Sequence, residues 1–447
     1  MSAPAAPKAT TTRQMRLAAS IYSGEASQAW RHPQARPDAR LDLGTFVEYA
    51  ELAEAACFDT LFLPDTGAPA RLAPDVMQRL SSLSVFEPLT LMCALAMHTQ
   101  RIGLVYTASA TFNEPYHVAR QVASLDHLSG GRAGWNLVTS LSRTQSANFG
   151  GGPQPAHDAR YRKAEEFHDV VTGLWDSFDD DAFVRDKASG RFVDPRKMHY
   201  LEHSGEFFSV EGPLRIARPP QGHPVVAQAG ASEAGRELGA RTADLIFCTN
   251  LSLEDGQTFY ADMKRRTVAH GRDPDDLKIL TGTAIVWGET DAEARARFEQ
   301  LSSLYPVDVA IHNLAIDLEG RNPDDKFPQD LPPSLGSQGH QKAITDFARR
   351  HDFTIRQTAQ ALAASAKHRV LIGSTTTIAD DLEAWFRQGA ADGFVVISPF
   401  FLDGFRDIAR HVVPELQRRG LFRSAYEGHT LREHLGVPRP PSRYRRA

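Results

Sequence analysis

Short apolar runs alternate with longer amphipathic stretches along almost the whole chain. Eight runs are nearly continuous in apolar residues, which predicts parallel strands buried on both faces. They cover residues 17–22, 60–64, 102–107, 133–139, 224–229, 244–248, 279–287 and 394–398. Between them, apolar residues recur at helical spacing over 43–57, 114–128, 158–175, 232–243, 291–304, 377–388 and 403–418. The repeated strand-then-helix order predicts an α/β fold, a (β/α)8 TIM barrel. A doubly wound sheet is the alternative, less favoured because the dinucleotide fingerprint is absent from the sequence.

Two polar, irregular segments at 176–222 and 305–368 interrupt this alternation. We interpret them as insertions in a single barrel domain spanning 15–438. A disordered leader over 1–14 and an extended C-terminal arm over 439–447 complete the predicted organisation. Because the strand-to-helix loops of a barrel build its active-site face, we expect both insertions to lie over that face.

Composition excludes several classes of protein. Lys and Arg number 50 against 55 Asp and Glu, a formal charge of −5, so no basic excess is available for nucleic-acid binding. No apolar run approaches the roughly 18 residues of a membrane span, and the N-terminus lacks the apolar core of a signal peptide. The three cysteines, Cys57, Cys93 and Cys248, are widely separated. These features predict a cytoplasmic protein with reduced thiols.

The predicted strands end in small polar residues, which in a barrel face the ligand. Asp65 follows the second strand, Thr107 ends the third, and Asn136 and Thr139 belong to the fourth. No nucleophile elbow, phosphate-binding P-loop or HExxH zinc motif is present in the sequence. His199 and His203 are four residues apart but lie in an irregular segment, so we predict no metal site there.

Two helix starts are candidates for holding an anion. Ser232 opens a helix directly after a strand, where it either caps the helix or shares its free N–H groups with a phosphate. His157 and Tyr161 lie at another helix start, after a glycine-rich stretch. The residues therefore indicate a metal-free polar pocket for a phosphorylated cofactor, without specifying its chemistry.

Five ordered motifs carry a family resemblance. They are AWRHP at 29–33, FDTLFLPD at 58–65, LSGGRAGWNLVTS at 128–140, HDARYRKAEEF at 157–167, and the stretch from ADGFVVIS to LREHLG within 391–436. Together they resemble the bacterial-luciferase-like flavin monooxygenases, in the branch of nitrilotriacetate monooxygenase component A and dibenzothiophene-sulfone monooxygenase. The resemblance extends from about residue 15 to 438.

The resemblance implies a two-component FMN-dependent monooxygenase. Reduced FMN would come from a separate NAD(P)H:flavin reductase, and O2 would form a flavin-peroxide that oxidises a small N-, S- or halogen-containing substrate. It also implies a homodimer or homotetramer. A deazaflavin-dependent oxidoreductase and a non-catalytic flavin-binding barrel are the alternatives.

The resemblance also assigns roles to individual residues. Thr107 and Asn136 correspond to the catalytic polar pair beside the isoalloxazine ring. The other implied cofactor contacts are Asp65 and Thr139 near the flavin, His157 and Tyr161 at its tail, and Ala231 and Ser232 at its phosphate. His32, in the AWRHP motif, is either catalytic or part of a packing corner. Residues 24–28 depart from the family pattern, so the substrate is not carried over from any relative.

Overall fold

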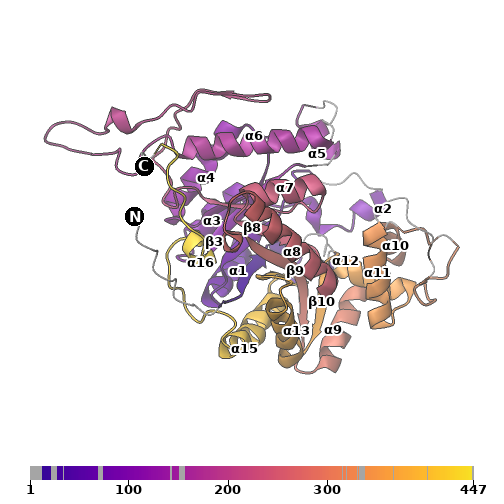
Figure 1. Ribbon diagram of the computed structural model, residues 1–447. Helices are drawn as coiled ribbons and strands as arrows, with labels where there is room; N and C mark the ends of the chain where they lie inside the picture. Colours follow the sequence, from indigo (N-terminus) through magenta and orange to yellow (C-terminus); the bar gives the residue numbers. More distant parts are fainter. Residues whose placement is uncertain are drawn as a thin grey trace.

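The protein folds as a closed barrel of parallel strands surrounded by helices (Figure 1). The computed structural model describes residues 13–21, 28–33, 35–68, 74–140, 143–150, 157–314, 316–318, 320–329, 331, 338–365, 367–399 and 401–444. The predicted leader therefore lies outside the described residues except for Arg13 and Gln14. Of these, Arg13 forms an ion pair of 2.8 Å with Asp392.

Eight strands form the ring: β1 (Arg16–Ser20), β2 (Thr60–Leu63), β3 (Gly103–Ser109), β4 (Ala133–Val138), β7 (Val225–Gln228), β8 (Leu245–Cys248), β9 (Lys278–Trp287) and β11 (Gly393–Ile397). They pair in the order β9-β11-β1-β2-β3-β4-β7-β8, and β8 pairs back with β9 to close the barrel. Each corresponds to one of the eight predicted runs. The TIM-barrel prediction is confirmed, and the doubly wound alternative is excluded by the closure.

The predicted helices surround this ring. They are α1 (Leu43–Ala55), α4 (Pro115–Ser129), α6 (His157–Trp175), α7 (Glu233–Thr242), α9 (Asp291–Ser303), α13 (Thr375–Arg387) and the broken helix α14 (Asp403–Asp407) to α15 (Val413–Arg418). Further helices are α2 (Pro74–Met77), α3 (Pro88–Ala96), α5 (Arg143–Asn148) and α8 (Leu253–Ala269). Asp42 caps α1 by accepting hydrogen bonds from the N–H groups of Gly44 and Thr45.

An unpredicted strand, β10 (Arg369–Gly373), extends the sheet outside the closed ring. It pairs with residues 283–287 of β9, whereas β8 pairs with residues 278–281. The other edge of β9 is occupied by β11. The strands β8 and β10 therefore lie one after the other along the same edge of β9. The strand β9 is long enough for both, since it spans ten residues.

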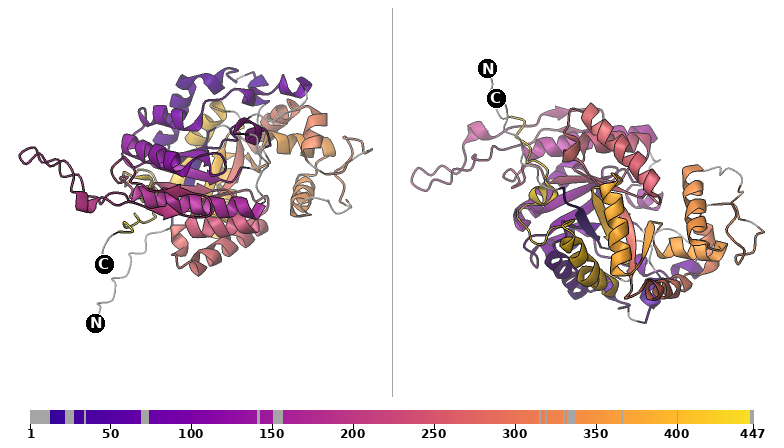
Figure 2. Two further views of the ribbon diagram at one scale, coloured as in Figure 1. Left: turned by 90° about the horizontal axis from the view of Figure 1, so that it is seen from above. Right: turned by 60° about the horizontal axis from the view of Figure 1, so that its bottom comes forward.

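The segment 305–368 is largely helical, so the expectation of irregular structure there is wrong. It contains α10 (Val307–Asn313), α11 (Gln338–His351) and α12 (Ile355–Ala364), the last with a capping box between Thr354 and Gln357. These helices share a separate apolar core that includes Phe298, Phe347 and Leu362. The segment follows β9 and stands at the side of the barrel (Figure 2).

The expectation for the other insertion, 176–222, is wrong as to its face. It connects the end of α6 to the start of β7, so it belongs to the amino-end face of the barrel rather than the carboxyl-end face. It contains the small hairpin β5 (His203–Ser204) and β6 (Ser209–Val210). Part of it extends away from the barrel, on the opposite side of the molecule from 305–368 (Figures 1 and 2). The predicted arm packs against it, since Arg439 ion-pairs with Asp180.

The amino end of the barrel is closed by the short helix α16 (Leu431–Leu435). Leu431 and Leu435 pack among interior residues of the strands, including Val105 and Val225. A Cβ on Gly103 would lie only 2.4 Å from Leu431 Cδ1, so the glycine makes room for this plug. A ligand therefore has to use the carboxyl end. Within the described ranges, no helix is both long and apolar enough to span a bilayer.

Candidate active site

A hydrogen-bonded polar pair, Thr107 and Asn136, lies inside the barrel near its carboxyl end. The two residues are register partners on β3 and β4, so their side chains point to the same side. Val105, two residues before Thr107, packs in the interior cluster, which places both side chains inside. The Asn136 amide donates from Nδ2 to Thr107 Oγ1 at 2.9 Å, and Thr107 Oγ1 donates to the Leu63 carbonyl at 2.8 Å.

The remaining polar atom of this pair is unsatisfied. Asn136 is 4% exposed, and its Oδ1 is buried without a hydrogen-bond partner in the described part of the chain. Leaving a buried acceptor unpaired costs about 1–3 kcal/mol, and native structures rarely do so without a functional reason. Asn136 Oδ1 is therefore suited to accept a hydrogen bond from an N–H group of a ligand.

A second contact brings the starts of α6 and α7 together. Ser232 caps α7, because its Oγ accepts a hydrogen bond of 3.1 Å from the Gly235 N–H. The same hydroxyl donates to Tyr161 on α6 at 3.1 Å. A Cβ on Gly235 would lie 2.9 Å from the Gly230 Cα, so only glycine allows this close approach. Tyr161 and Ser232 thus flank a helix N-terminus that is suited to an anion.

Arg160 is a candidate site residue that the sequence alone does not single out. It is only 7% exposed, its Nε has no hydrogen-bond partner, and it makes no ion pair with any residue that the structure describes. It lies in the first turn of α6, on the buried stripe that continues through Ala164 and Phe167. The spacing of four and then three residues along this stripe could have revealed it. A buried cation without a counter-charge costs several kcal/mol, which an anionic ligand would offset.

The other predicted residues follow strand ends or begin a helix in the sequence. Asp65 follows β2 and accepts a hydrogen bond of 3.0 Å from the Gly67 N–H, and partial burial raises the pKa of its carboxyl group. Thr139 follows β4 and is half-buried, and Ala231 is exposed with its carbonyl bonded to Arg236 Nε at 3.0 Å. His157 begins α6, but its side chain lies outside the described residues. The structure therefore joins Thr107 with Asn136 and Tyr161 with Ser232.

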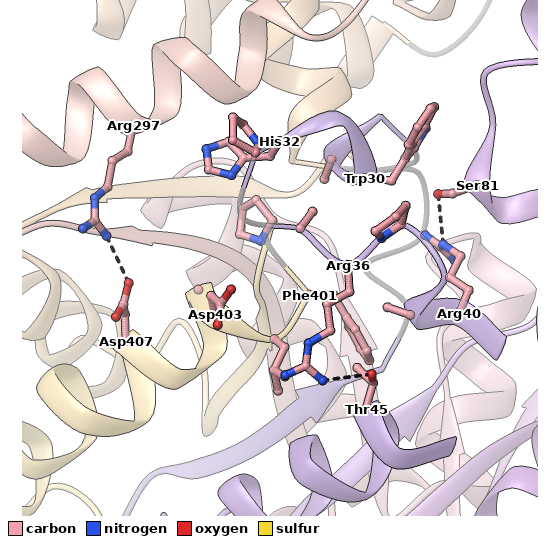
Figure 3. A pocket seen from close by; sticks show the side chains of 18 of the residues that line it. Trp30, His32, Arg36, Arg40, Thr45, Ser81, Arg297, Phe401, Asp403 and Asp407 are labelled. Atoms are coloured by element: carbon pink, nitrogen blue, oxygen red, sulfur yellow. Dashed lines mark hydrogen bonds and ion pairs between the residues drawn. The ribbon is translucent and has the colours of Figure 1, made fainter. Parts of the chain in front are cut away.

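A cavity of about 390 Å³ lies beside the exits of β1 and β11 (Figure 3). Residues 29–33 and 35–40 form one wall, and α9, Pro399 and residues 401–407 form the others. Trp30 lines it while donating from Nε1 to the Arg79 carbonyl at 2.9 Å, and the 9%-exposed His32 faces it as well. The AWRHP motif therefore both packs and lines a cavity. A catalytic role for His32 stays one of the two alternatives, and residues 24–27 lie outside the described residues.

The charges around this cavity are matched within the protein. Arg297 pairs with Asp407 at 3.0 Å, and Arg36 contacts Thr45 at 3.2 Å (Figure 3) and Glu48 at 3.1 Å. The cavity therefore differs from the surroundings of Arg160, where the described part of the chain supplies no carboxylate partner to the buried cation.

The two histidines at 199 and 203 are held by separate carboxylates. His199 lies 3.0 Å from Asp179, and His203 lies 2.9 Å from Glu166. The structure groups no three potential metal-ligating side chains within the part of the chain that it describes.

Comparison with known proteins decides the family. The sequence profile described as luciferase-like monooxygenase matches residues 20–392. The chain belongs to this family. It is 44% identical over 430 residues to nitrilotriacetate monooxygenase component A of Aminobacter aminovorans, covering 94% of this chain and 95% of that protein. It is 39% identical to dibenzothiophene-sulfone monooxygenase of Rhodococcus erythropolis, over 96% and 98% of the two chains.

Solved structures agree with this placement. A riboflavin lyase determined with a modified FMN and riboflavin superposes with a TM-score of 0.82 at 30% identity. The alignment covers 95% of this chain and 96% of that one. The resemblance predicted from the five motifs is confirmed, and the protein is an oxidoreductase of the luciferase-like monooxygenase class.

Proposed function

We propose that the protein is the oxygenase component of a two-component system. It takes reduced FMN from a separate NAD(P)H:flavin reductase and uses O2 to oxidise a small organic substrate that contains nitrogen, sulfur or halogen. The observation that carries this proposal is the unpaired, buried Asn136 Oδ1 beside Thr107. The full-length similarity to named monooxygenases and to an FMN-containing structure supports it.

The polar pair fits the ring of a reduced flavin. Reduced isoalloxazine carries more N–H donors than the oxidised ring, and Asn136 Oδ1 is an acceptor inside the barrel without a partner among the described residues. Thr107 fixes the Asn136 amide through the 2.9 Å hydrogen bond, so the acceptor is oriented before the ligand arrives. Asp65 and Thr139 flank the same end of the barrel. When bound, reduced FMN supplies the electrons that activate O2.

The second contact region fits the phosphate of FMN. Ser232, the Ala231 backbone and the start of α7 offer donors, and Tyr161 and His157 belong to the facing helix. Arg160 supplies a buried positive charge on that helix. A phosphate dianion would offset the cost of burying this guanidinium, which no carboxylate within the described residues does.

The rest of the fold encloses the reaction. The α16 plug closes the amino end, so substrate and O2 enter from the carboxyl end. The helices α10 to α12 follow β9 on that side, where we place them as the cover of the substrate. Such a cover would exclude water from the reacting centre.

The cellular context is part of the same proposal. We place the protein in the cytoplasm as a homodimer or homotetramer. Several apolar side chains near the entrance are exposed, including Trp30 at 39%, Leu41 at 53% and Leu43 at 40%. Neighbouring exposed apolar side chains of this kind support self-association.

Anaerobic titration with reduced FMN, followed by rapid mixing with O2, tests this function. The proposal predicts saturable binding and a protein-dependent absorbance transient before the oxidised flavin spectrum returns. Reduced deazaflavin is titrated in parallel as the competing cofactor. Tighter binding of the deazaflavin, together with reoxidation of FMN at its free-solution rate, would contradict the proposal.

A further inference from the structure

His368 lies at the junction between β8 and β10, outside the five family motifs. Along one edge of β9, β8 pairs as far as Thr281 and β10 begins its pairing at Thr283. Gly282 lies between these two contacts. His368 immediately precedes β10, so it stands at the level of Gly282.

Gly282 shows that the His368 ring lies inside the barrel. Gly282 is the register partner of Val395, which belongs to the interior cluster. A Cβ built on Gly282 would lie 2.5 Å from His368 Nδ1 and 2.6 Å from Phe247 Cε2. Glycine within a strand weakens it and commonly marks a close approach. Here it leaves the space that the imidazole occupies.

The imidazole is fixed on one side and unpaired on the other. It stacks on Phe247 with 5.3 Å between ring centroids, and its Nδ1 lies 3.3 Å from Thr249 Oγ1. Burial lowers the pKa of His368 to about 4, so the ring is neutral at pH 7. No described residue hydrogen-bonds its Nε2, and the side chain is half-buried rather than sealed.

The ring faces the same opening as the polar pair. Thr107 and Asn136 belong to β3 and β4, and His368 stands between β8 and β9, three strands further round the ring. An eight-stranded barrel is only wide enough inside for side chains or one small ligand. A molecule held over Thr107 and Asn136 is therefore within reach of the opposite wall.

We propose that His368 is a substrate-positioning residue whose Nε2 hydrogen-bonds an uncharged polar group of the molecule oxidised at this site. Phe247 and Thr249 complete this wall. The inference rests on the proposed function and extends it to the substrate side. A neutral imidazole does not compensate a buried charge, so the substrate group that it meets is uncharged, such as an amide, ether or sulfone oxygen.

Chemical labelling tests whether His368 faces the ligand. Diethyl pyrocarbonate, which modifies accessible neutral imidazoles, is applied to the full chain with and without saturating reduced FMN under anaerobic conditions. Peptide mass spectrometry then reports the rate at each histidine. We expect His368 to react and bound ligand to slow its reaction about tenfold at tenfold excess over Kd. His434 is the control, because it is 2% exposed at the amino end and bonds Arg101 through Nε2.

Two variants separate positioning from a structural role. His368→Phe should leave the affinity for reduced FMN within about twofold while lowering kcat/KM about tenfold, as expected for one lost hydrogen bond. His368→Gln, which keeps a hydrogen-bonding group, should recover part of that loss, mainly in KM. Dibenzothiophene sulfone, named for a relative of this chain, is the probe, because its sulfone oxygens are uncharged acceptors of the proposed kind.

The outcomes distinguish this inference from the proposed function. Failure of reduced FMN to bind would remove the proposed function and this inference with it. If FMN binds but His368 reacts equally fast with and without it, only the inference is overturned. Equal losses of FMN affinity and kcat/KM in His368→Phe would also overturn it, because a structural role would affect both.

Discussion

The two ends of the barrel satisfy their buried arginines to different extents. At the amino end, Arg432 meets Asp244 at 3.1 and 2.8 Å, and Arg423 ion-pairs with Asp59. Arg132, also at that end, has no ion pair within the described residues but donates to the carbonyls of Ala96, Thr99, Ile102 and Ser129. Single nitrogen atoms of Arg16, Arg423 and His434 are unpaired there, although Arg423 and His434 have other partners and Arg16 is only half-buried. At the carboxyl end, Arg160 is as buried as Arg423 but meets no carboxylate within the described residues.

This difference indicates that the amino end is built to close the barrel and the carboxyl end to bind a ligand. A matched ion pair beside α16 holds the plug in the barrel and leaves nothing for a ligand to satisfy. An unmatched cation and an unmatched amide oxygen lower the stability of the unliganded protein and are compensated when a ligand binds. Under the proposed function, the same strands carry a structural end and a ligand-binding end, so variants at the two ends should behave differently.

The largest effect is expected from breaking the pair at the amino end. Arg432→Met leaves the Asp244 carboxylate buried without its partner, which should lower the free energy of unfolding by about 3–5 kcal/mol. Denaturant unfolding measures this. Arg162→Met is the control, because the Arg162–Glu206 pair is exposed to solvent and should contribute little to stability. Equal losses in both variants would remove the distinction between the two pairs.

At the carboxyl end, Asn136→Ala should affect reaction more than stability. Removing the oriented acceptor should slow O2-dependent oxidation of bound reduced FMN about 10²-fold, as for other preorganised polar groups. Affinity for reduced FMN should stay largely intact, since ring contact is only part of the binding. Stopped-flow reoxidation measures the rate. Unchanged turnover would exclude Asn136 from the role given to it.

Arg160→Met gives the most direct contrast with Arg432→Met. The unliganded protein should keep its stability or gain about 1 kcal/mol, because an uncompensated buried charge is removed. Affinity for FMN should fall by about tenfold, while affinity for riboflavin, which lacks the phosphate, should not change. Parallel titrations with the two flavins measure this. A similar loss for both flavins would show that Arg160 does not meet the phosphate.

A smaller effect is expected from the pH dependence at the amino end. Burial and nearby Arg423 lower the pKa of His434 to about 4. The contribution of His434 to the free energy of unfolding is therefore fully present above its pKa in the unfolded chain, about 6.5, and is lost as the pH falls towards 4. Desolvation raises the pKa of buried Asp126 to about 6. Between about pH 4 and 6, Asp126 therefore makes the free energy of unfolding rise as the pH falls, opposite to the effect of His434. Asp59 and Glu433 also face His434 and favour its charged form.

His434→Gln isolates this contribution. It should flatten the rise in unfolding free energy between pH 4 and 6.5 by about 1–2 kcal/mol. Unfolding midpoints measured across that range in both proteins give the difference. The same slope in wild type and variant would mean that His434 does not titrate differently on unfolding.

Much of the fold was predictable because fully buried parallel strands appear as continuous apolar runs. All eight ring strands were found in this way, whereas β10 lies outside the ring at the end of the 305–368 segment. The helices of that segment were missed because proline, glycine and polar residues interrupt their pattern. The expected face of 176–222 is wrong although the chain order contains the answer, since a segment between a helix and the next strand of the closed ring lies at the amino end.

The residues of the candidate site differ in the same way. The sequence predicts Thr107, Asn136, Tyr161 and Ser232 because they belong to recognisable motifs at strand and helix ends, and their contact with a flavin stays a prediction. It does not single out Arg160, although a motif contains it, or His368, because their significance depends on which partners they lack in three dimensions. A sequence displays the residue types but not the atoms that remain unpaired after folding.

A crystal structure of the protein with FMN bound would show directly where the cofactor lies. We expect the isoalloxazine ring over Thr107 and Asn136, a flavin N–H group hydrogen-bonded to Asn136 Oδ1, and the phosphate beside Ser232 and Arg160. FMN bound instead in the cavity beside Trp30 and His32, with Asn136 Oδ1 and Arg160 still unpaired, would contradict this expectation.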